Sequence, residues 1–238
     1  MGFYKVTFND HGGISRASIY NSGCNFRCLG CAYRLREEQE SKPELDDARL
    51  FEMLGRLKPK RVHFLGGEPT SNCKLASIAR FAQEELGALT KIGHSNGSGR
   101  IPDHIDEASI SIKAIDDSIH KYYTGASNKK VLENFHEAFE RGIALHASTV
   151  LIPGLVGSDE VESISAFIAL MDRQIPLHIT GYIPAPGTPW RAPSSDEMET
   201  AAKKAKAHLK NVAFRSIDSG EFARLREKDP LYCSLRIL

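Results

Sequence analysis

The sequence predicts an α/β fold built around a parallel β-sheet. Short β-rich stretches alternate with amphipathic helical stretches along nearly the whole chain, and no linker or low-complexity segment interrupts them. This alternation is the pattern of β-α-β units that share one sheet. Six strands are well marked, fewer than a closed eight-stranded barrel contains. We therefore expect a partial (β/α)6 barrel in a single domain over residues 1–238, with its core at about residues 15–217.

The predicted elements follow one another from residue 15 onward. Strands are expected at residues 15–21, 61–65, 91–95, 108–112, 144–152 and 177–183, with a further strand at 212–217. Helices are expected at residues 32–40, 45–57, 75–86, 131–141, 161–171 and 196–209.

In the first half of the chain, helical periodicity and turn residues support these boundaries. Leu50, Leu54 and Leu57 recur at helical spacing, and Lys58-Pro59 closes the helix. Residues 61–65 then alternate as a strand does and run into a Gly-Gly pair, which allows the backbone to approach a ligand closely.

In the second half, glycine and proline mark where elements end. The helix at 131–141 ends at Gly142, and the β-rich stretch at 144–152 stops at Pro153-Gly154. If the strands are parallel, ligand sites belong at their carboxyl ends.

Composition describes an ordinary globular protein, with 41% hydrophobic and 26% charged residues. The formal net charge of +1 gives no bulk electrostatic argument for nucleic acid or an anionic membrane, although it does not exclude a local basic patch. No apolar run approaches membrane-spanning length, and residues 1–10 lack the pattern of a secretory signal. A cytoplasmic protein is expected.

The most specific stretch of the chain holds Cys24, Cys28 and Cys31, three of its five cysteines. An odd number of cysteines with three crowded together favours a reducing compartment and metal ligation over disulfides. Cys73 and Cys233 are left over, and we expect a small buried residue and a thiol in the tail.

Three soft thiolates in one compact loop suit an iron-sulfur cluster. A zinc site would need a fourth ligand, which one of the nine histidines could supply, so this alternative stays open. A four-iron cluster held by three cysteines would keep one iron open. That iron could chelate a small ligand and pass an electron into it.

A second motif, Gly66-Gly67-Glu68-Pro69, stands at the end of the next predicted strand. Together with the cysteine loop it resembles the radical S-adenosylmethionine (SAM) enzymes, over roughly residues 15–200. The resemblance implies a partial barrel, a 4Fe-4S cluster and SAM as cofactors, and an oxidoreductase activity. The reduced cluster of such enzymes splits SAM into methionine and a 5'-deoxyadenosyl radical, which abstracts hydrogen from the substrate.

The resemblance also implies site residues. The three cysteines would ligate iron; the residues that would bind or support SAM are Gly66, Gly67, Glu68, Pro69, Asn96, Ser111, Lys113 and His178. Of these, Lys113 and Ser111 would hold the SAM carboxylate. Asn96 is equally well explained as half of an Asn-Gly turn pair. His178 shares a strand face with Thr180 and Tyr182, which either lines the chamber or meets solvent.

Residues 108–116 resemble the fourth strand of glycyl-radical-enzyme activases, with Ser111 where those enzymes have aspartate. Many family members also carry an aromatic residue near the adenine, immediately before the third cysteine, where this chain has Gly30. Tyr33 or Phe26 is expected to replace it.

We expect an activating-enzyme-like protein that acts on a protein or peptide and takes electrons from a ferredoxin or flavodoxin. The alternatives are radical modification of a small molecule or nucleobase in cofactor or tRNA biosynthesis, and, more remotely, an iron-sulfur electron-transfer protein.

Overall fold

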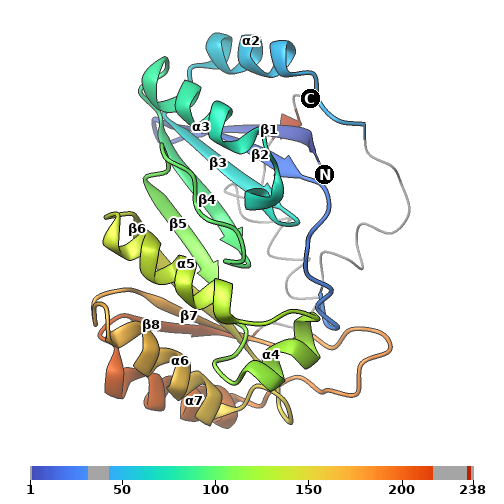
Figure 1. The fold of residues 1–238 in the computed structure, drawn as a ribbon, viewed down its shortest axis with the longest axis vertical. Coiled ribbons are helices and arrows are strands. Elements are labelled where there is room, and N and C mark those ends of the chain that lie inside the picture. Colours follow the sequence, from blue (N-terminus) through green and yellow to red (C-terminus); the bar gives the residue numbers. More distant parts are fainter. Residues whose placement is uncertain (1, 32–42, 217–234, 237–238) are drawn as a thin grey trace.

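The computed structural model describes residues 2–31, 43–216 and 235–236. These residues form one nine-stranded sheet in the order β8-β7-β6-β5-β4-β3-β2-β1-β9 (Figure 1). The strands are β1 (Phe3–His11), β2 (Ile14–Asn21), β3 (Arg61–Gly66), β4 (Leu89–Ser95), β5 (Glu107–Ser111), β6 (Ala144–Leu151), β7 (Leu177–Gly181), β8 (Val212–Arg215) and β9 (Leu235–Arg236).

From β2 to β8 every neighbouring pair is parallel, whereas β1 is antiparallel to both β2 and β9. The ends of the sheet, β8 and β9, do not pair with each other. The sheet is therefore open, which confirms the predicted α/β fold and its partial barrel.

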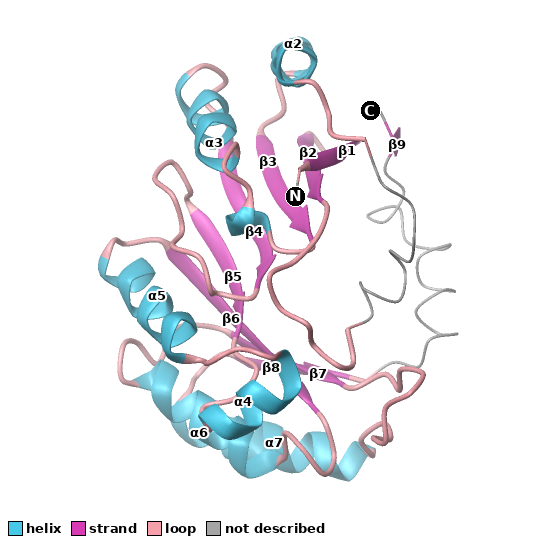
Figure 2. Cartoon of the chain, turned by 45° about the vertical axis from the view of Figure 1, so that its right-hand side comes forward, coloured by secondary structure: helices cyan, strands magenta, loops and turns pink. Residues whose placement is uncertain are grey.

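Helices connect the parallel strands. They are α2 (Asp47–Leu57), α3 (Leu75–Glu84), α4 (Asp117–Thr124), α5 (Lys129–Glu140), α6 (Ser158–Ala169) and α7 (Ser195–His208). Figure 2 shows the sheet curving away from α3, α5 and α6, which lie along its convex side. None of the helices in the described ranges is long and apolar enough to cross a membrane.

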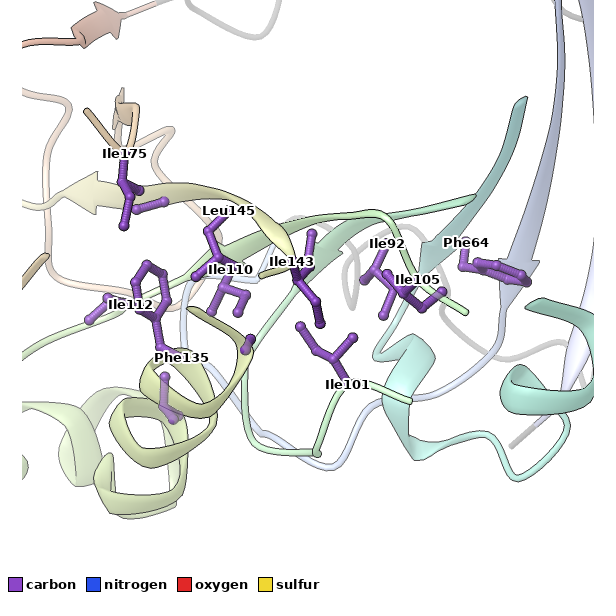
Figure 3. Packing of buried hydrophobic residues seen from close by; sticks show 14 of the residues in the cluster. Phe64, Ile92, Ile101, Ile105, Ile110, Ile112, Phe135, Ile143, Leu145 and Ile175 are labelled. Atoms are coloured by element: carbon purple, nitrogen blue, oxygen red, sulfur yellow. The ribbon is translucent and has the colours of Figure 1, made fainter. Parts of the chain in front are cut away.

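The apolar core lies between the convex side of the sheet and the helices. Phe64 of β3, Ile92 of β4 and Ile110 of β5 are fully buried there, and Phe135 of α5 packs on the same layer (Figure 3). Residues next to these in sequence point the opposite way, because side chains alternate along a strand. His63, Lys91 and Ser109 therefore face the concave side.

Helix ends follow the local sequence. The Asp46 side chain accepts a hydrogen bond from the Arg49 amide at 2.9 Å, which starts α2, and Lys58 ends it in the left-handed conformation with φ of 43°. At α7, Ser194 and Glu197 form a capping box.

The sequence prediction identified all seven parallel strands but not β1, β9 or the short helix α4. The predicted strand at 177–183 ends earlier, at Gly181, so Tyr182 lies beyond it. Cys73 is exposed, which corrects the expectation of a buried residue. The predicted helix at 32–40 and Cys233 lie outside the described residues.

Phe64 provides a test of the core. We expect Phe64→Ala to lower the free energy of unfolding by about 3–5 kcal/mol, because the residue is fully buried and its truncation leaves a cavity in the core. Phe214→Ala, at a position 41% exposed, should cost less than about 1 kcal/mol. Urea unfolding measures both, and equal losses would contradict this packing.

Candidate functional site

The sequence motifs meet at one rim of the sheet. The cysteine loop follows β2, Gly67-Glu68 follows β3, Asn96 follows β4 and Lys113 follows β5. Because these strands are parallel, their carboxyl ends lie at the same edge.

The cysteine loop is held from outside by the end of α4. The Arg27 amide donates to the Thr124 carbonyl at 2.9 Å, and the Leu29 amide donates to the Tyr123 carbonyl at 3.0 Å. These carbonyls belong to the last turn of a helix, where they have no intrahelical partner. The loop and the helix end therefore satisfy each other, a contact that the sequence analysis missed.

The three thiols are half-buried, and the other two lie close enough to Cys28 to contribute to raising its pKa. Burial raises the pKa of Cys28 to about 11, although the Lys113 charge opposes this. Burial also raises the pKa of Cys24, whose sulfur accepts hydrogen bonds from the Phe26 amide and the Asn96 side chain. In the described residues no three side chains of His, Cys, Asp or Glu already surround one point that would fit a metal ion.

The turn after β3 packs directly on the start of the cysteine loop. A Cβ on Gly67 would lie 1.7 Å from the carbonyl oxygen of Gly23, so no side chain fits there. Gly66 has a φ of 82°, which only glycine adopts without strain. The Glu68 amide also donates to the Gly23 carbonyl at 2.9 Å.

The carboxylate of Glu68 is fully buried and bonds to the chain itself. It accepts from the amide and hydroxyl of Thr70, from the Ser95 hydroxyl at 2.9 Å and from the Asn96 amide at 2.5 Å. Burial raises its pKa, while these donors lower it. Pro69 is likewise buried. The Glu68 side chain thus positions the rim, and the backbone of this turn is left to meet a ligand.

Asn96 lies beside the cysteines. Its side-chain amide donates to Asn25 at 2.8 Å and approaches the Cys24 sulfur at 3.6 Å. Gly97 follows with a φ of 75° and would place a Cβ 2.8 Å from Ile110. Asn96-Gly97 is thus a tight turn that also contacts the cysteine loop.

Lys113 and Ser111 are brought together across the rim from the cysteines. The Lys113 ammonium donates to the Ser111 hydroxyl at 3.0 Å, and that hydroxyl bonds to Ser148 at 2.8 Å. His178 pairs with Ser148 in the register of β6 and β7, so it continues the same row. Partial desolvation and the Arg215 charge lower the pKa of His178.

Tyr182 occupies the space beside Gly30. A Cβ on Gly30 would lie 2.5 Å from the Tyr182 ring. The tyrosine is buried, its oxygen accepts from the Ala185 amide at 3.1 Å, and its ring meets that of Trp190 edge-on. Phe26 is buried in the core against His120, and Tyr33 lies outside the described residues.

Comparison with known proteins adds the family. The model of the radical SAM superfamily matches residues 18–167. A protein of Methanocaldococcus jannaschii with the provisional name of glycyl-radical enzyme activating enzyme is 29% identical over 208 residues, covering 83% of this chain and 80% of that protein. A GTP 3',8-cyclase of Chlorobaculum tepidum is 23% identical over 164 residues. The match covers 63% of this chain and 47% of the cyclase, so the chain spans about half the length of the cyclase.

Among solved structures, a radical SAM methyltransferase from Sphaerobacter thermophilus superposes with a TM-score of 0.63. It is 16% identical, and the match covers 88% of this chain and 68% of the methyltransferase. At that identity the likeness concerns the fold alone.

Glu68 offers a test of how the rim is built. We expect Glu68→Gln to lower the free energy of unfolding by about 1–3 kcal/mol, because an amide nitrogen cannot accept the hydrogen bonds of the buried carboxylate. Glu52→Gln, on the exposed face of α2, removes the same charge and should leave stability nearly unchanged. If urea unfolding gives the same result for both variants, the hydrogen bonds of Glu68 do not stabilise the rim.

Proposed function

The chain belongs to the radical SAM superfamily, and we propose that Cys24, Cys28 and Cys31 hold its 4Fe-4S cluster at the rim described above. Members of this superfamily use such a cluster together with SAM, so the chain is an enzyme that performs an oxidoreductase-type radical reaction. One observation carries the residue assignment: the Gly66–Pro69 turn packs on the cysteine loop itself, so both motifs form one wall.

The residues fit the cluster. Three thiols in one loop would provide three soft ligands and would leave one iron of a four-iron cluster without a protein ligand. Ligation requires the thiolate forms, and the donors beside Cys24 and the Lys113 charge beside Cys28 partly offset the effect of burial on them. When bound and reduced, the cluster supplies the electron that splits SAM into methionine and a 5'-deoxyadenosyl radical.

The chain's own polar groups would orient SAM. Gly66 and Gly67 let this turn lie directly on the start of the cysteine loop, so its backbone groups would meet the amino end of SAM beside the cluster. Lys113 would neutralise its carboxylate, with Ser111 as a second hydrogen-bonding group. Asn96 supports the ligand from the cysteine side, and His178 borders the chamber farther along the sheet.

For the reaction, we propose hydrogen abstraction from a protein or peptide, as in an activating enzyme. The relative from Methanocaldococcus jannaschii supports this substrate class through its name. Similarity to the GTP 3',8-cyclase supports the alternative, modification of a small molecule. A ferredoxin or flavodoxin in the cytoplasm would supply the electron.

The cysteines provide the first test. We expect Cys28→Ala to abolish 5'-deoxyadenosine formation after anaerobic reconstitution and reduction, and to lower bound iron and sulfide, with an unchanged circular dichroism spectrum. Cys73→Ala, at an exposed cysteine away from the loop, is the matched control and should keep both. Zinc in the purified, oxygen-protected protein, or full iron content in Cys28→Ala, would rule out this ligand set.

The substrate class is tested separately. Deuterium from a labelled glycyl-radical protein or peptide should appear in 5'-deoxyadenosine if the chain is an activating enzyme. Transfer from a labelled small molecule alone would support the alternative.

We further propose that Tyr182 supplies the aromatic wall of the adenine pocket. Its ring lies where a side chain before the third cysteine would lie, and it is fixed by Ala185 and Thr188. Phe26 is unsuited to this role because its ring packs in the core. This would explain why the chain has glycine at position 30.

A double-variant cycle tests this proposal. Tyr182→Ala should weaken SAM binding roughly 5- to 10-fold, the range expected for losing an aromatic contact. Gly30→Phe alone should also weaken it through the clash, whereas Gly30→Phe combined with Tyr182→Ala should recover part of the loss. Equilibrium dialysis measures the affinities, and Tyr122→Ala, at a ring 61% exposed, is the control. Additive losses would contradict a shared space.

A further inference from the structure

The concave face of the sheet carries an unbalanced group of cations below the rim. Arg16 of β2 pairs in register with Arg61 of β3, and Lys91 of β4 pairs with His63. We call Arg16, Arg61, His63 and Lys91 the basic patch. Among the described residues, Glu107 is the carboxylate paired with it: one of its oxygens lies 2.6 Å from Arg61 and the other 3.0 Å from Lys91. Arg16 has no ion pair within the described residues.

The basic patch also contains hydrogen-bonding atoms without partners. Of the buried side-chain atoms in the described ranges that lack a hydrogen bond, three belong to the basic patch and one to the adjacent strand β1: Nε of Arg16, Nε of Arg61, Nε2 of His63, and Oγ1 of Thr7. Thr7 lies opposite Ser18, which pairs with His63, so all four side chains are on adjacent strands. Buried polar atoms normally have partners, and four orphans in one place indicate a site for a ligand that accepts hydrogen bonds.

The charge of the basic patch is strong enough to act on its own histidine. Burial, with the charges of Arg16, Lys91 and Arg61, lowers the pKa of His63 to about 4, and Glu107 only partly opposes them. The side chains of Arg61 and Lys91 are only 33% and 20% exposed. Water therefore screens these cations incompletely. Like charges opposite one another on neighbouring strands destabilise a sheet, and a bound anion would remove that cost.

We propose that the basic patch binds an anionic group of the substrate, a carboxylate or a phosphate. The identification of the anion as part of the substrate rests on the proposed function. Anion binding by the basic patch is independent of that function. His63 lies three residues before Gly66, a distance of about 10 Å along the strand. A substrate anchored here extends toward the rim and presents its reacting carbon beside the site proposed for SAM.

Binding of simple anions to the full chain tests the proposal. Titration calorimetry at constant ionic strength uses inorganic phosphate in one arm and succinate in the other, which separates phosphate from carboxylate recognition. We expect saturable binding in at least one arm. Arg16→Gln should weaken it roughly 10- to 100-fold, as for loss of a charged hydrogen bond, and Arg16→Lys should keep most of it. Arg80→Gln removes an exposed arginine of α3 and should change nothing.

Two further measurements locate the anion and separate this proposal from the previous one. The anion should raise the pKa of His63 from about 4, observed by NMR of labelled histidine, and Lys113→Ala should leave binding intact. SAM cleavage should persist in Arg16→Gln and be lost in Cys28→Ala, so failure of the anion-binding proposal can be distinguished from failure of the proposed function. Absence of saturable binding in both arms, equal affinities of Arg16→Gln and Arg80→Gln, or loss of binding in Lys113→Ala would overturn the proposal.

Discussion

The buried carboxylate of Glu68 is the interaction on which the rim of the sheet depends. It follows β3, yet it bonds to Ser95 and Asn96 at the end of β4, and its backbone bonds to Gly23 and Asn21 at the end of β2. One residue therefore ties three strand ends together. A charged group removed from water is stable only when donors surround it, and here every donor comes from the rim itself. The result is a backbone whose amides are fixed before any ligand arrives, which is how a site lowers its cost of reorganisation.

The two faces of the sheet are chemically separate. The convex face carries Val62, Phe64 and Ile92, which the helices cover, while the alternate positions carry His63, Lys91 and Ser109. A strand that faces solvent on one side shows such alternation in an antiparallel sheet, but parallel sheets are usually covered on both faces. The polar concave face therefore indicates a surface that binds a ligand. The curvature of the sheet brings side chains of distant strands toward a common space.

Much of this arrangement follows from the sequence alone. The parallel strands and their helices were predictable because periods of two and 3.6 residues differ clearly, as in residues 61–65 and 45–57. The cysteine loop and the Gly-Gly turn were predictable as motifs, and their shared location follows from parallel strands. The first strand was missed because Phe3–His11 pairs antiparallel with β2 and lies outside the repeating β-α units. Its polar residues also obscure the two-residue alternation that marks a strand.

Contacts between distant segments could not be predicted from local pattern. The local sequence Tyr182-Ile183-Pro184 does not reveal that the Tyr182 ring fills the space beside Gly30. The glycine at position 30 indicated that another side chain occupies this space, and the tertiary structure identifies that side chain as Tyr182. The basic patch was hidden for the same reason, because Arg16, Arg61 and Lys91 are far apart in the sequence. Only the strand register places them side by side.

The junction between α4 and the cysteine loop has a consequence for how this protein can vary. Two backbone amides of the cysteine loop donate to carbonyls in the last turn of α4, so the geometry of the loop depends on a helix almost one hundred residues away in sequence. Lengthening or shortening that helix by one residue would rotate the two carbonyls away and reshape the loop without altering any of its cysteines. Homologues that differ in the length of α4 would therefore differ in the shape of the cysteine loop, even where their cysteine motifs are identical.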